Sequence, residues 1–260
     1  MELFPAAVFN PSKASRPRTA RGPVAGGAIE RLPFTVRRVE TEADLLKAVR
    51  IRHAAYARHV PDFARSLAQP EAADYDADTI VLLAESKLDG TPIGSTRIRT
   101  NLYRPLGVEE SVVLPDWLQG KRLVEATRLG IDEGRVGRMV KIALIKACFM
   151  YCEDNDIDYS VATGRPPVDR QYDQLMFVDV FPELGLVPLR HVGNIPHRIM
   201  AFEIATFQQR WAEARHPMLN FFFNTHHPDI DVGPIAPPSL ALPGRVLPQP
   251  ARPRVERAFA

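Results

Sequence analysis

An arginine stands on the apolar face of the first predicted helix. Leu45, Ala48, Val49, Arg52 and Tyr56 are spaced so that they share one side of that helix. A guanidinium that is buried without a partner costs several kcal/mol. We therefore expect Arg52 either to form a structural ion pair with a carboxylate or to line a wet cavity that binds a substrate.

Two later segments could supply a partner. Asp74 and Asp76 flank a tyrosine just before a predicted strand, where they could also form an exposed acidic turn. In the returning strand of the next hairpin, the segment Gly94-Ser95-Thr96-Arg97 places Ser95 and Arg97 on one face. A single arginine on a strand usually faces solvent, so each of these segments is a weak signal by itself.

A carboxylate and an arginine interrupt an otherwise apolar strand, Glu125-Ala126-Thr127-Arg128-Leu129. Both groups are costly to bury unless they are paired or functional. In a regular strand, Glu125 and Arg128 would face opposite sides of the sheet. A β-bulge would turn one of them toward the other side, and bulges are common beside active sites.

Arg135, Gly137 and Arg138 begin the longest amphipathic helix. Free N–H groups at a helix N-terminus, a glycine that permits close approach and two cations suit a phosphate group. Glycine and arginine also begin many helices that bind nothing. The segment is an incomplete match to the Q/R-x-x-G-x-G/A loop of CoA-binding acetyltransferases, because Gly134 and Met139 occupy its first and last positions.

Both strands and helices must position these charged residues. Strands are predicted at 34–39, 80–84, 92–100, 122–129, 157–162, 186–189 and 198–204. Helices are predicted to follow Thr41, to span 136–153 and 169–177, and to begin near Thr206. This order predicts a mixed α/β fold with an early antiparallel meander and one βαβ crossover.

The composition excludes some functional classes of protein. The chain has 260 residues and a formal net charge of +2, which gives no basic field for nucleic acid. No run of about 18 apolar residues predicts a membrane span, and the first ten residues do not read as a secretory signal. Cys148 and Cys152 are expected to be reduced thiols rather than metal ligands, which favours a cytoplasmic protein.

Proline is dense at both ends of the chain. We expect residues 1–33 to be a proline- and arginine-rich extension, residues 34–227 to form the folded domain, and residues 228–260 to be a proline-rich tail. His197, His226 and His227 are assigned no role, because histidines near such a tail are more often surface residues.

Taken in order, the charged segments resemble the acyl-homoserine-lactone synthases and their relatives, the FeeM-like long-chain N-acyl amino acid synthases. Arg52-x-x-x-Tyr56 matches the family's R-x-x-x-F/Y, and Gly94-Ser95-Thr96-Arg97 matches its G-S/C-x-R. Glu125-Ala126-Thr127-Arg128-Leu129 matches E-x-S/T-R-F/L, and Asp74-Tyr75-Asp76 corresponds to the family's acidic segment. The resemblance covers roughly residues 34–207.

The resemblance implies a GNAT-like sheet that is splayed between its fourth and fifth strands. An acyl-phosphopantetheine thioester, carried by acyl carrier protein or CoA, would lie in the opening as a co-substrate, and no tightly bound cofactor is implied. A small amine or amino acid would attack the thioester. Glu125 is implied as the general base, and N–H groups of its strand would stabilise the oxyanion.

The resemblance also implies an ion network at the lip of the pocket. The substrate-binding residues would be Arg52, Tyr56, Asp74, Asp76, Arg97, Thr127 and Arg128, and the phosphopantetheine-binding residues would be Arg135, Gly137 and Arg138. The network could hold the acceptor's carboxylate or only order the N-terminal helices. Candidates for an acyl tunnel are Val140, Leu144 and Phe221-Phe222-Phe223, for which core packing is an equal interpretation.

Departures from the family patterns separate its two branches. Position 129 is Leu rather than an aromatic residue, and the tryptophans, Trp117 and Trp211, are far from the first motif. These features favour an N-acyl amino acid synthase over an acyl-homoserine-lactone synthase. The alternatives are an acetyl-CoA-dependent GNAT enzyme and a non-catalytic module that binds an acyl carrier.

Overall fold

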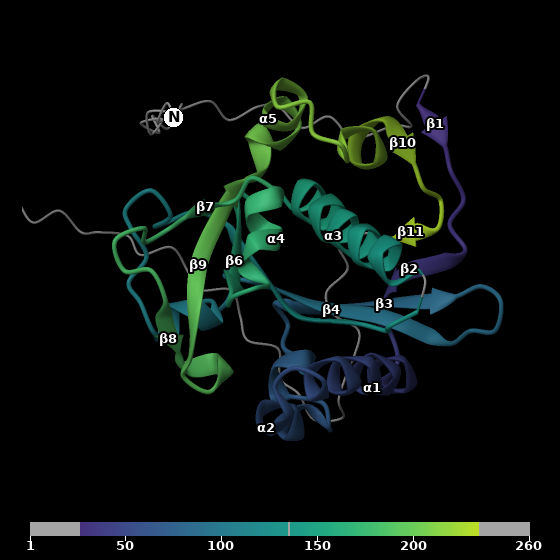
Figure 1. Ribbon diagram of the computed structural model, residues 1–260, viewed down its shortest axis with the longest axis horizontal. Helices are drawn as coiled ribbons and strands as arrows, with labels where there is room; N and C mark the ends of the chain where they lie inside the picture. The colour runs from purple at the N-terminus through teal and green to yellow at the C-terminus, as the bar shows by residue number, and fades with distance from the viewer. Residues whose placement is uncertain (1–26, 135, 234–260) are drawn as a thin grey trace, which may run out of the picture.

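The computed structural model describes residues 27–134 and 136–233, and its centre is a large mixed sheet (Figure 1). Along the sheet the strands are β11 (Ile230–Asp231), β2 (Phe34–Arg38), β3 (Thr79–Ser86), β4 (Pro92–Thr100), β5 (Leu123–Ile131), β6 (Tyr159–Gly164), β9 (Ile195–Glu203) and β7 (Val178–Asp179). β8 (Val187–Leu189) also pairs with β9, and β1 (Ala28–Ile29) pairs with β10 (Thr225–His226).

Helices cover both faces of the sheet (Figure 1). They are α1 (Glu42–Ala57), α2 (Pro61–Ala64), α3 (Gly137–Asp154), α4 (Asp169–Gln174) and α5 (Phe207–Glu213), with a π-helix at Asn220–Asn224. Short 3-10 helices are η1 (Arg65–Leu67), η2 (Ala72–Tyr75), η3 (Gly107–Glu110), η4 (Arg190–Val192) and η5 (Ile204–Thr206). α1 and α2 lie on one face, whereas α3 and α5 lie on the other. None of the helices among the described residues has the length and apolar character that crossing a membrane requires.

The predicted mixed α/β fold is confirmed. β2 to β5 form the antiparallel meander, and α3 is the crossover to β6, which runs parallel to β5. Thr41 caps α1, since its hydroxyl accepts the Asp44 N–H at 3.2 Å. The short strands β1, β7, β10 and β11 and the one-turn helix α2 were not predicted, because two to four residues carry no usable period.

The sheet opens between β5 and β6, its fourth and fifth strands counted from β2. The two strands pair only from Leu123 opposite Tyr159 to Glu125 opposite Val161, and from there they separate. The second half of β5 therefore has one edge without a strand partner among the residues that the structure describes. This is the splayed, GNAT-like sheet that the resemblance implied.

Alternation along the strands decides which side chains share a face beside the opening. Leu123, Val161 and Ile199 pack in one cluster with η3 and η4. Val124 and Phe202 pack instead in the larger cluster under α3 and α5. Odd-numbered positions of β6, of β9 and of the first half of β5 therefore face the η3 and η4 side, and even-numbered positions face α3. After the register shift of β5 opposite Ser95 and Arg97 this order reverses, so that Leu129 faces α3.

The packed domain reaches beyond the limits predicted from proline density. β1 and buried Leu32 belong to it at one end, and β11 with buried Ile230 and Val232 belongs to it at the other. Asp229 joins the two ends of the packed domain, since its carboxylate accepts the Leu32 N–H at 2.9 Å. The predicted boundaries at 33/34 and 227/228 thus fall inside packed structure, and the rest of both predicted tails lies outside the described residues.

Gly130→Ala should lower the free energy of unfolding by about 2 kcal/mol, a typical cost of overpacking. A Cβ at Gly130 would lie 2.9 Å from the Arg52 Cα and 3.1 Å from the Ile51 carbonyl oxygen, so α1 would have to move away from β5. Chemical denaturation measures the change. Gly134→Ala is the control, because its nearest neighbour would be 3.9 Å away. Equal stability of the two variants would contradict this tight contact.

Candidate active site

Arg52 pairs with a carboxylate, one of the two outcomes its position predicted. Its side chain leaves the apolar face of α1, is 2% exposed, and donates to both oxygens of Asp74 at 2.9 and 2.7 Å. Arg97 of β4 donates to the same carboxylate at 3.1 Å. A helix, a strand and the segment before β3 are thereby joined through one buried acid.

Glu71 is the second acid of this network, and sequence reasoning missed it. It accepts two bonds from Arg128 at 2.8 and 2.7 Å, and it also pairs with Arg52 and Arg97 at 3.2 and 3.1 Å. Its own N–H donates to Asp74 at 2.8 Å, in a capping box at the start of η2. The spacing of an acid three residues before Asp74 was the available signal.

Asp76, expected in the network, is placed differently. Its ion pair is with Arg104, which also lies 3.2 Å from Asp78. Thr127 is at the edge of the network, where its hydroxyl accepts from Arg97 at 3.3 Å. The arginines and Asp74 thus meet as the resemblance implied, with Glu71 in the position expected for Asp76.

Arg128 is turned by the predicted β-bulge. Ser95 pairs with Gly130 and Arg97 pairs with Thr127, so two residues of β5 oppose one of β4. Arg128 takes a left-handed conformation with φ of 57°, which is unfavourable for a residue with a side chain. Its bidentate bond to Glu71 and its position 5.1 Å over the Phe63 ring hold it there.

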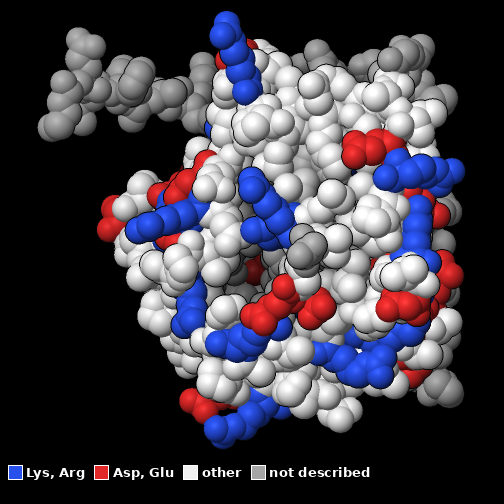
Figure 2. Space-filling model, turned by 45° about the vertical axis from the view of Figure 1, so that its right-hand side comes forward, with Lys and Arg blue, Asp and Glu red and all other residues white. Residues whose placement is uncertain are grey.

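The opening between β5 and β6 is a cleft of about 490 Å³. It is lined on one side by β5 from Ala126 to Ile131, and on the other by Thr163, Gly164 and Arg165, with Tyr56 and Phe63 from the α1 and α2 side. Among the lining residues are four cations, Arg58, Arg128, Lys141 and Arg165, and no carboxylate. Figure 2 shows a hollow on this side of the molecule with both Lys or Arg and Asp or Glu side chains at its edge. Arg58 and Arg128 are already paired with Glu133 and Glu71, so the attraction of the cleft for anionic groups rests mainly on Lys141 and Arg165.

Glu125 is completely buried beside the cleft rather than along its wall. Its carboxylate accepts the Gly107 N–H at 3.1 Å and lies 3.4 Å from the His191 imidazole. Burial opposes ionisation, but the His191 ring, Arg99 and the Gly107 N–H outweigh it and lower the pKa of Glu125. One carboxylate oxygen has no hydrogen-bond partner among the described residues. The base role of Glu125 remains a prediction.

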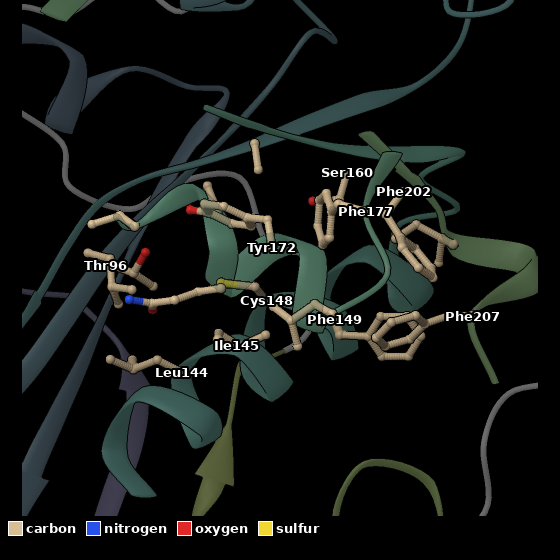
Figure 3. Close-up of a pocket in the computed structure, with 17 residues that line it drawn as sticks. Thr96, Leu144, Ile145, Cys148, Phe149, Ser160, Tyr172, Phe177, Phe202 and Phe207 are labelled. Carbon is tan, nitrogen blue, oxygen red and sulfur yellow. The ribbon is translucent and has the colours of Figure 1, made fainter. Parts of the chain in front are cut away.

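A smaller apolar chamber of about 100 Å³ adjoins the cleft on the α3 face (Figure 3). Ala126, Leu129 and Tyr172 line both spaces. The inner walls are Leu144, Ile145, Cys148 and Phe149 of α3 together with Leu175, Phe177, Phe202, Ile204 and Phe207. Burial raises the pKa of Cys148 to about 12 and also raises the pKa of Tyr172, so both keep their protons.

The predicted tunnel residues are only partly those of this chamber. Leu144 lines it, whereas Val140 packs in the core, where a Cβ on Gly94 would lie 2.5 Å from it. The Phe221–Phe223 segment is not among the lining residues; Phe222 and Phe223 contact Phe149 and Phe207 from behind. The chamber's aromatic walls come from separate elements, which the sequence order does not bring together.

The start of α3 carries the predicted phosphate-binding residues. A Cβ on Gly137 would lie 2.8 Å from the Asp132 carbonyl oxygen, and the Gly137 N–H donates to Gly134 at 3.0 Å. Gly137 therefore has a packing reason for its small size. Arg138 is exposed beside the cleft residue Lys141, and Arg135 lies outside the described residues.

Glu71→Gln should lower the free energy of unfolding by about 3 kcal/mol at pH 7, because it leaves Arg128 without its bidentate partner. Burial opposes ionisation of Glu71, but Arg128, Arg97 and Arg52 lower its pKa. The stability this pair contributes is present above the ordinary value of 4.5 and is lost as pH falls through the lower folded pKa. Urea denaturation at pH 7 and near pH 3 measures the free energy of unfolding of the wild type and of Glu71→Gln.

The difference between wild type and Glu71→Gln should therefore shrink in acid. Exposed Glu183→Gln serves as the control, with no change expected beyond about 0.5 kcal/mol. A difference that is the same at both pH values would show that the Glu71 charge does not stabilise the site.

Comparison with known proteins identifies the family. The family described as N-acyl amino acid synthase FeeM matches residues 47–201, which is more than half of the chain. No curated protein matches the chain.

Two solved structures are similar in fold. FeeM, an N-acyl amino acid synthase from uncultured soil microbes, is 18% identical with a TM-score of 0.52, over 70% of this chain and 96% of that one. The CoA-dependent acyl-homoserine lactone synthase BjaI, solved with MTA, is 18% identical with a TM-score of 0.51, over 75% and 93%. The chain belongs to the FeeM family of N-acyl amino acid synthases and is an N-acyltransferase.

Proposed function

We propose that this enzyme transfers a long-chain acyl group from a phosphopantetheine thioester to the amine of an amino acid. The observation that carries the proposal is that two unlike spaces adjoin at the split of the sheet and share Ala126, Leu129 and Tyr172 as lining residues. An apolar chamber lies on the α3 face, and a cation-lined cleft opens toward the α1 and α2 side. The chamber suits an acyl chain and the cleft suits anionic substrate groups.

The donor arm would lie between β5 and β6, with its acyl chain past Leu129 in the chamber. Acyl carrier protein is our proposed donor, because Arg138 and Lys141 at the mouth offer positive charge to an acidic partner. Gly137 and Arg138 would approach the phosphate. CoA is the alternative donor, and it is favoured by the similarity to BjaI, which is a CoA-dependent enzyme.

The acceptor would enter from the α1 and α2 side, where Arg58 and Arg165 can hold its carboxylate. Tyr56 and Thr127 line this part of the cleft. Arg52, Arg97, Asp74 and Glu71 would act on the acceptor indirectly, because they fix Arg128 and the bulge that form the cleft wall.

Acyl transfer needs a neutral amine, an oxyanion site and a proton for the leaving thiolate. The unpaired edge of β5 beyond Glu125 offers backbone N–H groups to the oxyanion. Tyr172, which stays protonated at the junction of cleft and chamber, can donate a proton toward the sulfur. Glu125 is the base proposed from sequence, and its buried position would require a relay to reach the amine.

Mass spectrometry of lipid extracts from cells that overproduce the chain tests the function. We expect new N-acyl amino acids, and much less of them in cells that produce Glu125→Gln at equal level, because the change removes a buried negative charge beside the cleft. Acyl-homoserine lactones would instead assign the chain to the other branch. No new lipid from a folded, abundant protein would refute the proposal.

Cys148→Phe should shift the preferred acyl chain toward shorter lengths. The added ring would fill the chamber between α3 and Tyr172, so a long chain loses its buried contacts, at about 0.8 kcal/mol per methylene. The measurement is kcat/KM for a series of acyl-CoA or acyl-carrier thioesters. Cys148→Ala, which leaves the chamber open, is the control. An unchanged length profile in Cys148→Phe would show that the chain binds elsewhere.

A further inference from the structure

His197 lies on β9 at the face of the split that is opposite the acyl chamber. It is two residues before Ile199, whose side chain packs with Leu123 and Val161 on the η3 and η4 side. Alternation places His197 on that same side. It lines the cleft together with Val192 and Ile195, near the end of β6 where Gly164 pairs with Arg198. An acceptor that enters from this face would therefore pass His197 before it meets the thioester.

The hydrogen bond of His197 fixes its tautomer. Nδ1 lies 2.7 Å from the Ile195 carbonyl oxygen. A carbonyl oxygen can only accept, so Nδ1 carries the proton, and in the neutral ring the lone pair is on Nε2. A neutral imidazole in this tautomer has its basic nitrogen on the side away from the Ile195 carbonyl.

The surroundings of His197 keep the ring neutral. Burial lowers its pKa below 6.5, and the charges of His191 and Arg165 act in the same direction, against the opposing effect of the Ile195 bond. The other histidine that lines the cleft, His59, is exposed. Among the described residues that line the cleft there is no carboxylate. His197 is partly buried in the wall, and its Nε2 is positioned to accept a proton.

We propose that His197 Nε2, rather than the Glu125 carboxylate, receives the proton from the acceptor amine. This inference rests on the proposed function. Glu125 faces the same side of the sheet but is completely buried against Gly107 and His191 and does not line the cleft. Its negative charge acts instead on its neighbours His191 and Arg99.

The step balances without any further reagent. The amine nitrogen forms a bond to the thioester carbonyl carbon, and one of its protons moves to Nε2. The C–S bond then breaks, and its electron pair leaves on sulfur. The imidazolium returns the proton to the thiolate, directly or through the Tyr172 hydroxyl, so the products are an amide and a free thiol.

His197→Asn is the test variant, because an asparagine amide can replace the Nδ1–H donor toward Ile195 but offers no base. Decanoyl-CoA with a mixture of the common amino acids is the probe, and thiol release and amide formation are both measured. We expect kcat to fall about 10²- to 10⁴-fold, with the KM for decanoyl-CoA within about threefold of wild type. Imidazole added to His197→Ala should restore activity at least about tenfold and should not restore Glu125→Gln.

Exposed His226→Asn on β10 is the matched control and should retain wild-type rates. A His197→Asn enzyme with a wild-type kcat, or imidazole rescue of Glu125→Gln instead of His197→Ala, would overturn the inference while the function stands. No amide from the wild type with either decanoyl-CoA or decanoyl-acyl carrier protein would refute the function itself. If the variants do not fold, nitrogen NMR of histidine-labelled wild type decides, since a proton on Nε2 in the neutral ring contradicts the proposed base.

Discussion

The buried pairing of Arg52, Arg97 and Arg128 with Glu71 and Asp74 is the constraint on which the site depends. Each guanidinium would be costly to bury alone, so the five side chains can stay inside only as a set. They come from α1, from the segment around η2, from β4 and from β5. Their mutual pairing therefore fixes how the α1 layer sits on the sheet.

The network also makes the strained conformation of Arg128 sustainable. A left-handed residue inside a strand is unfavourable by about 1 kcal/mol or more. The two bonds to Glu71 and the Phe63 ring offset that cost. The bulge then turns the end of β5 away from a regular ladder just where β6 departs. The charge network therefore shapes the wall of the cleft, although its residues are not proposed to contact the reacting atoms.

Because of the split, the same sheet borders both an apolar chamber and a polar cleft. Even-numbered side chains of β6, of β9 and of the first half of β5, together with Leu129 after the bulge, face the aromatic chamber, and odd-numbered ones face the side that carries Glu125, His191 and His197. In the proposed function, an acyl chain and a charged acceptor would thus approach one carbonyl from opposite faces. In a closed sheet the ladder hydrogen bonds would occupy the edge of β5 and block this passage.

The sequence by itself determined the order of the elements, the charged segments and the family resemblance. Those signals are local: Thr41 caps α1, the α1 face repeats at helical spacing, and Glu125 and Arg128 stand out in an apolar strand. Burial energetics also required either a carboxylate partner or a wet cavity for Arg52, and a β-bulge was the device that would turn either Glu125 or Arg128 to the other side.

Only the tertiary structure decided which charged side chains pair with each other and which side chains face the cleft. Glu71 replaces Asp76 in the network, because one full 3-10 turn of η2 places Glu71 and Asp74 on the same side while Asp76 reaches Arg104. The chamber's phenylalanines come from elements far apart in sequence, and Glu125 is sealed beside the cleft that His197 lines. Side-chain direction at the splayed strands depends on register and separation between distant segments, and no local pattern in the chain encodes these.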